Sequence, residues 1–230
     1  MDFFVEIGEL FSTAKYMNMI FEGLGRTLLV SVFAAILGLI IGTAVALVGM
    51  SEKSGFMKIL KAICKAYITV IRGTPMALQL FIMAYVVFEI RGFPQEITAI
   101  IAFGINSGAY VAENIRAGIL SVDIGQTEAG RALGLNSKVT MFSIVIPQAI
   151  KNVIPAIGNE LIALIKETSI VNMIGMFDLT MAATIIGAGN NMAGYFVPMT
   201  VVAIFYLGIV YLLTFGIKAI ERRLRKSDRR

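Results

Sequence analysis

Long apolar runs separated by short polar segments are the dominant pattern along this chain. The first run, residues 28–50, contains no charged residue and is long enough to cross a hydrocarbon core of roughly 30 Å as a helix. Other long runs cover residues 56–88, 94–120, 139–165 and 195–220, and a shorter one covers 170–186. The pattern therefore predicts an all-α polytopic membrane protein with five transmembrane helices.

Proline and glycine interrupt these runs at defined places. Arg72-Gly73-Thr74-Pro75 divides the second run, and Pro147 and Pro155 are expected to break the run at 139–165. Proline leaves a backbone carbonyl without its helical donor, and broken helices in transporters often line the substrate site. The break at 72–75 therefore predicts either a lining segment or a packing kink. Gly38 and Gly42 have GxxxG spacing, which permits close helix contact.

The N-terminal segment has a different pattern. Phe3, Ile7 and Leu10 recur at helical spacing, which predicts a short amphipathic helix on the membrane surface, with a disordered leader as the alternative. We expect residues 1–22 to form this interfacial segment, 23–222 the transmembrane domain and 223–230 a basic cytoplasmic tail.

The distribution of Lys and Arg predicts the orientation. Basic residues gather at 53–65 and 218–230, whereas residues 167–196 contain none. Because basic loops favour the cytoplasmic side, the C-terminus and the 51–65 loop are expected there, with the N-terminus and the 167–194 loop outside. Five crossings satisfy this assignment. The net charge of +5 then indicates topology and contact with anionic membrane lipid, not nucleic acid.

The amino-acid composition excludes several kinds of catalytic and metal site. The chain is 57% hydrophobic and 15% charged, against the 45–50% and about 25% typical of soluble domains. It has no His and a single cysteine, Cys64, which excludes His-based catalytic dyads and His-ligated metal centres. We expect no metal and no cofactor, and we interpret Cys64 as a small apolar side chain in a helix.

The stretch at 121–148 is the most polar segment inside the chain. A helix expected at 126–135 would present Glu128, Ala129, Ala132 and Leu133 on one face, and Gly134 would cap its C-terminus. Short exposed side chains suit docking into a cleft on a partner. The alternative is an amphipathic connector that rests on lipid.

The same stretch carries a family pattern, EAA-x3-G-x9-I-x-L-P. Here it consists of Glu128-Ala129-Gly130, then Gly134, Ile144 and Ile146-Pro147, with Gly130 in place of the second Ala and Ile146 in place of Leu. The chain thus resembles the membrane subunits of bacterial ABC importers. Segments at 72–75, 107–119 and 159–171 resemble the polar amino acid uptake permeases, and the resemblance covers roughly residues 20–222.

The resemblance implies a type I ABC importer permease fold, with five helices per subunit and a dimer around a central pathway in the cytoplasmic membrane. The second permease would be another copy or a homologue, and an extracytoplasmic solute-binding protein would deliver a polar amino acid for import by alternating access. A coupling helix would dock on a cytoplasmic ATP-binding dimer through Glu128, Ala129, Gly130, Arg131, Ala132 and Gly134. The sequence itself lacks GxxxxGK[ST], so if transport is driven by ATP, another chain must bind the nucleotide.

Ionisable residues inside the runs are candidates for the substrate site, because a charge that faces lipid at the bilayer centre costs at least ~2.5 kcal/mol. Lys166 suits the α-carboxylate of an amino acid, and Glu160 suits its α-amino group. The alternatives are a local Glu113–Arg116 pair, and Lys166 and Glu167 reaching out to the interface. The full set of expected substrate residues is Thr74, Asn106, Glu160, Lys166 and Glu167.

Two other functions would also suit a chain of this composition. A stand-alone channel or secondary transporter would use the intramembrane charges and would not need the pattern at 128–147. A membrane enzyme would need a convergent nucleophile and base. The chain has no His, and its only Asp residues are at positions 2, 123, 178 and 228, so no aspartyl dyad is available within the apolar runs. We therefore expect a transporter subunit and not an enzyme.

Overall fold

The longest element of the structure is α2 (Ala14–Met50), a single helix of 37 residues. The structure is a computed structural model that describes residues 3–51, 55–189 and 194–225. At 1.5 Å per residue α2 extends for about 55 Å, well beyond a hydrocarbon core of roughly 30 Å, so at least one end projects from it. The boundary expected between residues 22 and 23 falls within this helix, and only α1 (Phe3–Ser12) precedes it.

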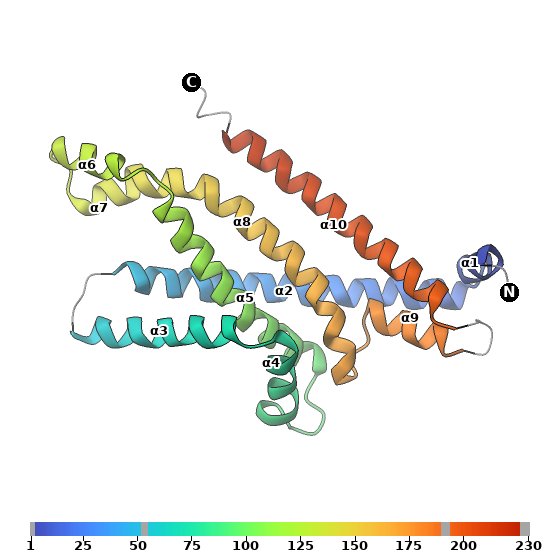
Figure 1. Cartoon of the computed structure of the whole chain (residues 1–230). Coiled ribbons are helices and arrows are strands. Elements are labelled where there is room, and N and C mark those ends of the chain that lie inside the picture. Colours follow the sequence, from blue (N-terminus) through green and yellow to red (C-terminus); the bar gives the residue numbers. More distant parts are fainter. Residues whose placement is uncertain (1–2, 52–54, 190–193, 226–230) are drawn as a thin grey trace.

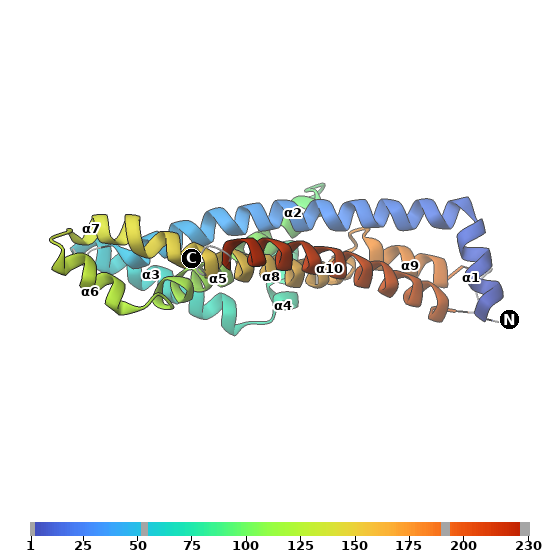
Figure 2. The same cartoon turned by 90° about the horizontal axis from the view of Figure 1, so that it is seen from above.

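The remaining elements form an elongated, all-helical bundle alongside α2 (Figures 1 and 2). No strand occurs within the described ranges. In chain order they are α3 (Gly55–Gly73), α4 (Met76–Ile82), η1 (Met83–Val87), α5 (Gln95–Leu120), α6 (Ile124–Ala132), α7 (Ser137–Thr140), η2 (Met141–Val145), α8 (Ile146–Glu167), η3 (Thr168–Ile174), α9 (Leu179–Gly187) and α10 (Phe196–Arg225).

The long helices carry the apolar surface that a membrane requires. Ile40 on α2, Ile63 on α3 and Leu212 on α10 are exposed in the isolated chain, and many other large apolar side chains share this exposure. Within the described residues, three helical stretches are long and apolar enough to span a membrane, at Ala14–Met50, Ser137–Ile174 and Phe196–Leu224. The bent pair α3–α4 would make a fourth. The expected all-α membrane fold is confirmed, and five crossings stay a prediction.

Helices α2 and α5 cross in close backbone contact, and glycines make the contact. A Cβ atom added at Gly42 would lie 2.6 Å from the Val111 side chain and 2.7 Å from the Gly108 carbonyl oxygen. A Cβ atom at Gly38 would lie 2.8 Å from Ser107. The GxxxG pair predicted to permit close packing therefore does so, with α5 as its partner. Small residues at such a crossing let two helix backbones approach each other.

The helix that contains the two later prolines differs from the prediction. Helix α8 continues through Pro155, so the break expected there is wrong. A proline removes only one intrahelical donor, and packing on both sides keeps the helix continuous. Pro147 lies in the first turn of α8, directly after the π-helical turn η2. A π-helical turn departs from the regular α-helical hydrogen-bond pattern, so it can accommodate the hydrogen bond that Pro147 cannot donate.

The end of the bundle near the N-terminus has its own apolar core. Leu10 of α1, Ile20 of α2, Leu179 of α9 and Val197 of α10 pack together, and Figure 1 shows α1 beside the end of α10. The predicted amphipathic helix therefore exists, and its Leu10 side packs on protein. The segment expected as a loop at 167–194 contains η3 and α9. The basic tail begins inside α10, and residues 226–230 lie outside the described residues.

We expect Gly42→Ala to destabilise the chain, because the added methyl group meets Val111 and the backbone of Gly108. Overpacking of this kind costs about 1–3 kcal/mol. The matched control is Gly49→Ala on the same helix, which meets no atom within 4 Å and gains helix propensity. Thermal unfolding of both variants in detergent checks this, and equal stability would contradict the packing role of Gly42.

Candidate functional site

The helix break between α3 and α4 is the first feature of the site. The chain bends by 110° between α3 and the α4–η1 segment, and Pro75 precedes α4 in an extended conformation. In a continuous helix the Ile71 carbonyl would accept a hydrogen bond from the residue at position 75, which here has no N–H. The predicted break at Arg72, Gly73, Thr74 and Pro75 is therefore present, and it leaves carbonyl groups that need new donors.

A glutamine that the sequence interpretation missed supplies those donors. The Gln79 amide nitrogen lies 2.7 Å from the Ile71 carbonyl oxygen, 3.1 Å from that of Thr74 and 2.8 Å from the Thr74 hydroxyl. Buried Asn106 on α5 donates to the Gln79 amide oxygen at 3.0 Å. Two expected substrate residues, Thr74 and Asn106, thus meet through Gln79. A polar side chain between Leu78 and Leu80, one turn after the proline, is the signal that points to it.

Next to this network, α3, α5 and α8 bring charged groups together. The Arg72 guanidinium lies 5.2 Å from the centre of the Tyr110 ring, a cation–π contact. The Glu160 carboxylate on α8 interacts with the hydroxyl of Ser107, the neighbour of Asn106, and with the charge of Arg72. This part of the bundle therefore offers a cation, a carboxylate and a hydroxyl from three different helices.

The two charges at the end of α8 point in different directions. Glu167 lies close enough to Glu160 for their charges to interact, as expected for two residues seven apart on one helix face. Lys166 instead lines a groove with Tyr206, Leu207 and Val210 of α10. The charge of Arg72 acts on Glu160, and Lys166 lies beside α10, so a joint role of Lys166 and Glu160 in one site stays a prediction.

Glu113 and Arg116 form a local ion pair on α5. Arg116 donates from Nε to a Glu113 carboxylate oxygen at 3.0 Å and from a second nitrogen to the other oxygen. The pair is bidentate and follows the i, i+3 spacing that the sequence allowed. It also lies near Arg72, whose charge acts on Glu113.

At the opposite end of the bundle from α1, α6 forms a short helix with well-defined ends (Figure 1). Asp123 caps its N-terminus by accepting a hydrogen bond of 2.7 Å from the Gly125 N–H. At its C-terminus, Gly134 has φ +81° and donates to the Arg131 carbonyl, while Leu135 donates to that of Gly130. These two bonds form a Schellman motif, which confirms the predicted cap at Gly134.

One face of α6 is exposed and the other packs on the protein. Glu128, Ala129, Arg131 and Ala132 are exposed. Leu133, which follows the helix, is 82% exposed.

Gly130 is buried, and a Cβ atom at this position would lie 2.8 Å from the Thr140 side chain. Gly130 therefore lets α6 pack on α7 and does not belong to the exposed face. Arg131 reaches Ser137 at 3.3 Å.

Comparison with known proteins identifies the family. Residues 38–226 match the model of the binding-protein-dependent transport system inner membrane component. The chain belongs to this family. The match covers α5, α6 and α8, so the exposed helix and the charged cluster both lie within the family domain.

Individual relatives agree with this assignment. The chain is 41% identical over 219 residues to the arginine transport system permease protein ArtQ of Bacillus subtilis, covering 94% of this chain and 97% of ArtQ. It is 41% identical to the putative glutamine transport system permease protein GlnP of Rickettsia bellii, covering 89% and 92%. The crystal structure of an amino acid ABC transporter superposes with TM-score 0.85 at 39% identity, covering 93% of this chain and 98% of that chain.

The family membership settles the broad alternatives. This permease is a multi-pass protein of the cytoplasmic membrane and a subunit of an ABC importer, in which a separate chain hydrolyses ATP. It is therefore neither an enzyme nor a stand-alone channel. Within the described residues, no three His, Cys, Asp or Glu side chains gather in a group that would hold a metal ion.

We expect Gln79→Leu to destabilise the helix break of this permease. The change removes the donor to Ile71 and Thr74 and leaves the buried Asn106 amide without its acceptor, at a cost of about 1–3 kcal/mol. Thr74→Val removes only one of the three acceptors of Gln79, so its effect on the unfolding temperature in detergent should be smaller. Equal unfolding temperatures for Gln79→Leu and the native chain would contradict this role of Gln79.

Proposed function

We propose that this permease imports a polar amino acid by alternating access, in a dimer with a second copy or a homologous permease. A cytoplasmic ATP-binding dimer drives the cycle, and an extracytoplasmic solute-binding protein delivers the substrate. The observation that carries the proposal is α6, a capped helix at one end of the bundle with Glu128, Ala129 and Ala132 exposed. Short exposed side chains on a capped helix suit docking into a cleft on a partner.

The structure supports a mechanical link between α6 and the charged cluster. Gln148 of α8 donates to Gln126 of α6 at 3.2 Å, and Gly130 packs on Thr140 at the start of the segment that leads into α8. Asn152 of α8 donates to Ser121 at the end of α5 at 2.8 Å. A push on α6 is therefore transmitted to α8, whose next turns carry Glu160.

Substrate recognition in this proposal uses Arg72 and Glu160. An amino acid is a zwitterion, so its binding site needs a cation for the α-carboxylate and an anion for the α-amino group. Arg72 and Glu160 interact across α3 and α8, and Ser107 adds a hydroxyl beside them. Glu167 continues the acidic face toward the end of α8. Thr74 and Asn106 act through Gln79 by holding the helix break that positions Arg72.

The class of substrate is a polar amino acid. The two relatives reported above are named for arginine and glutamine transport, which share the α-carboxylate and α-amino groups and differ in side-chain charge. A site built for the shared groups suits both. Glu160 and Glu167 also provide carboxylates for a cationic side chain.

The orientation in this proposal places α6 and the C-terminus in the cytoplasm and the N-terminus outside. Lys58, Lys61 and Lys65 lie on the N-terminal half of α3, which is at the same end of the bundle as α6 (Figure 1). Glu6 on α1 and Asp178 at the start of α9 lie at the opposite end. This charge asymmetry agrees with the preference of basic residues for the cytoplasmic side.

We expect Glu128→Lys to weaken the contact between the permease and its ATPase. The reversed charge on the exposed face of α6 weakens docking of the ATPase, and a loss of ~1.4 kcal/mol corresponds to about tenfold weaker association. Substrate-stimulated ATPase activity and uptake should both fall in proteoliposomes that contain the assembled transporter. Glu9→Lys on α1 makes the same charge change at the far end and should leave both unchanged. Normal coupled transport by Glu128→Lys would rule out the docking role.

We expect Glu160→Gln to raise the substrate concentration needed for half-maximal uptake by about tenfold, because an amide replaces the charge that pairs with the amino group. The glutamine keeps a hydrogen bond to Ser107, so the fold should be retained. Glu167→Gln, exposed at the end of α8, should have a smaller effect. Uptake kinetics in proteoliposomes test both, and unchanged kinetics for Glu160→Gln would remove Glu160 from the pathway.

A further inference from the structure

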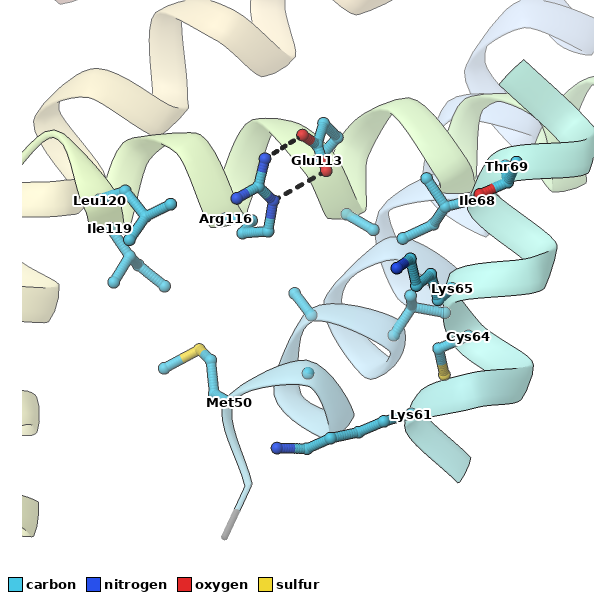
Figure 3. A pocket seen from close by; sticks show the side chains of 14 residues that line it. Met50, Lys61, Cys64, Lys65, Ile68, Thr69, Glu113, Arg116, Ile119 and Leu120 are labelled. Carbon is cyan, nitrogen blue, oxygen red and sulfur yellow. Dashed lines mark hydrogen bonds and ion pairs between the residues drawn. The ribbon is translucent and has the colours of Figure 1, made fainter. Parts of the chain in front are cut away.

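A cavity of about 620 Å³ lies between α2, α3 and α5, at the end of the bundle that carries α6 (Figure 3). Its walls are mostly apolar and come from all three helices, with Val45 and Met50 on α2, Ile68 on α3, and Ile119 and Leu120 on α5. Glu160 and the other residues of α8 are not among its lining residues. The Glu113–Arg116 pair belongs to its wall, and the charge of Arg72 acts on Glu113.

The polar groups of the cavity are predominantly basic. Lys61 and Lys65 of α3 and Arg116 of α5 line it, and Glu113 is the single acidic residue in the lining. In Figure 3, Lys65 extends from α3 into the space between the helices, and Arg116 lies along α5 with its guanidinium turned toward Glu113. Three cations and one carboxylate give the cavity a net positive charge.

Two of these cations already have partners. Arg116 is paired with Glu113, and the Lys61 ammonium donates to the Ser51 carbonyl at 2.6 Å, which leaves further N–H donors free. Within the described ranges the structure gives Lys65 no hydrogen bond and no ion pair. Lys65 is exposed in the isolated chain and lines the open side of the cavity, so its ammonium group is accessible to an anion that approaches from outside. An anion there would gain a charged partner that the described residues do not supply to Lys65.

We propose that this cavity binds an anionic phospholipid from the membrane leaflet at the α6 end. The phosphate would lie against Lys65 and Lys61, and an acyl chain would cover the apolar wall formed by Val45, Ile68 and Ile119. Basic pockets between transmembrane helices bind anionic lipid headgroups in this way. A free phosphate would leave the apolar wall uncovered. A lipid contacts both the basic groups and the apolar wall, so it fits the cavity better than an inorganic anion.

The surroundings of the cavity also favour lipid. Leu47 of α2 and Ile59 and Ile63 of α3 are exposed close to it in sequence, which is typical of a surface that faces acyl chains. The wall on α5 ends at Leu120, and Ser121 to Asp123 then lead directly into α6. A bound lipid therefore contacts the helix end from which α6 extends.

Cys64 is a natural reporter of the occupant, because it lines the cavity and is the only cysteine of the chain. The experiment measures the rate of Cys64 alkylation by N-ethylmaleimide, read by mass spectrometry of the permease. The complete transporter is reconstituted in phosphatidylcholine vesicles with or without phosphatidylglycerol. We expect phosphatidylglycerol to slow alkylation. Lys65→Gln should reduce this protection by about fivefold, the effect of one basic contact at a membrane surface.

The matched control is Lys58→Gln, which removes the same charge from an exposed position on α3 outside the cavity and should keep the protection. Comparing the two vesicle types within each variant cancels any direct effect of the substitution on the thiol. Equal alkylation rates of the native chain in both vesicles would overturn the proposal.

Two other outcomes would also overturn the lipid as occupant. Equal protection by inorganic phosphate in phosphatidylcholine vesicles would assign the cavity to a free anion. Complete protection in every vesicle would mean that another protein surface, such as the second permease, covers the cavity. None of these measurements depends on transport, so their failure leaves the proposed function untouched.

Discussion

Close backbone contact between α2 and α5 is the constraint on which the rest of the bundle depends. Gly38 and Gly42 leave no room for a side chain because Ser107, Gly108 and Val111 occupy that space. This contact brings the polar segment of α5 to a fixed distance from α3 and α8. Asn106 and Ser107 can then meet Gln79 from one side and Glu160 from the other. Apolar attraction between helices is weak in lipid, so such packing provides much of the stability.

The helix break shows how a membrane protein tolerates an irregular backbone. Pro75 removes a hydrogen bond that no water replaces in the membrane interior, and each unsatisfied group there is costly. The Gln79 side chain takes the place of the missing donor at Ile71, and Asn106 holds that side chain in position. The break is therefore a rigid corner, and it places Arg72 over Tyr110 at the edge of the charged cluster.

The exposed helix α6 lies at one end of the bundle and is connected to α8, which carries Glu160, by a continuous packed segment. Gly130 packs on Thr140, and the chain then continues through a π-helical turn into α8 without a loop. In this arrangement the segment from Glu128 to Pro147 connects the exposed face of α6 to the first turn of α8. In the proposed mechanism, a partner that moves α6 also moves α8 and, with it, Glu160.

Sequence patterns by themselves determined the long apolar helices, the break at Pro75, the cap at Gly134, the local Glu113–Arg116 pair and the position of the exposed helix. Each depends on neighbours in the chain, because proline and glycine act locally and hydrophobic periodicity follows one helix. Only the tertiary structure decided that Gly130 faces inward, that Gln79 closes the break and that α8 runs through Pro155. It also decided that Arg72 of α3 lies near enough to Glu160 of α8 for their charges to interact. These depend on which helices touch and on the rotation of each about its axis, and spacing along one chain segment contains no information about either.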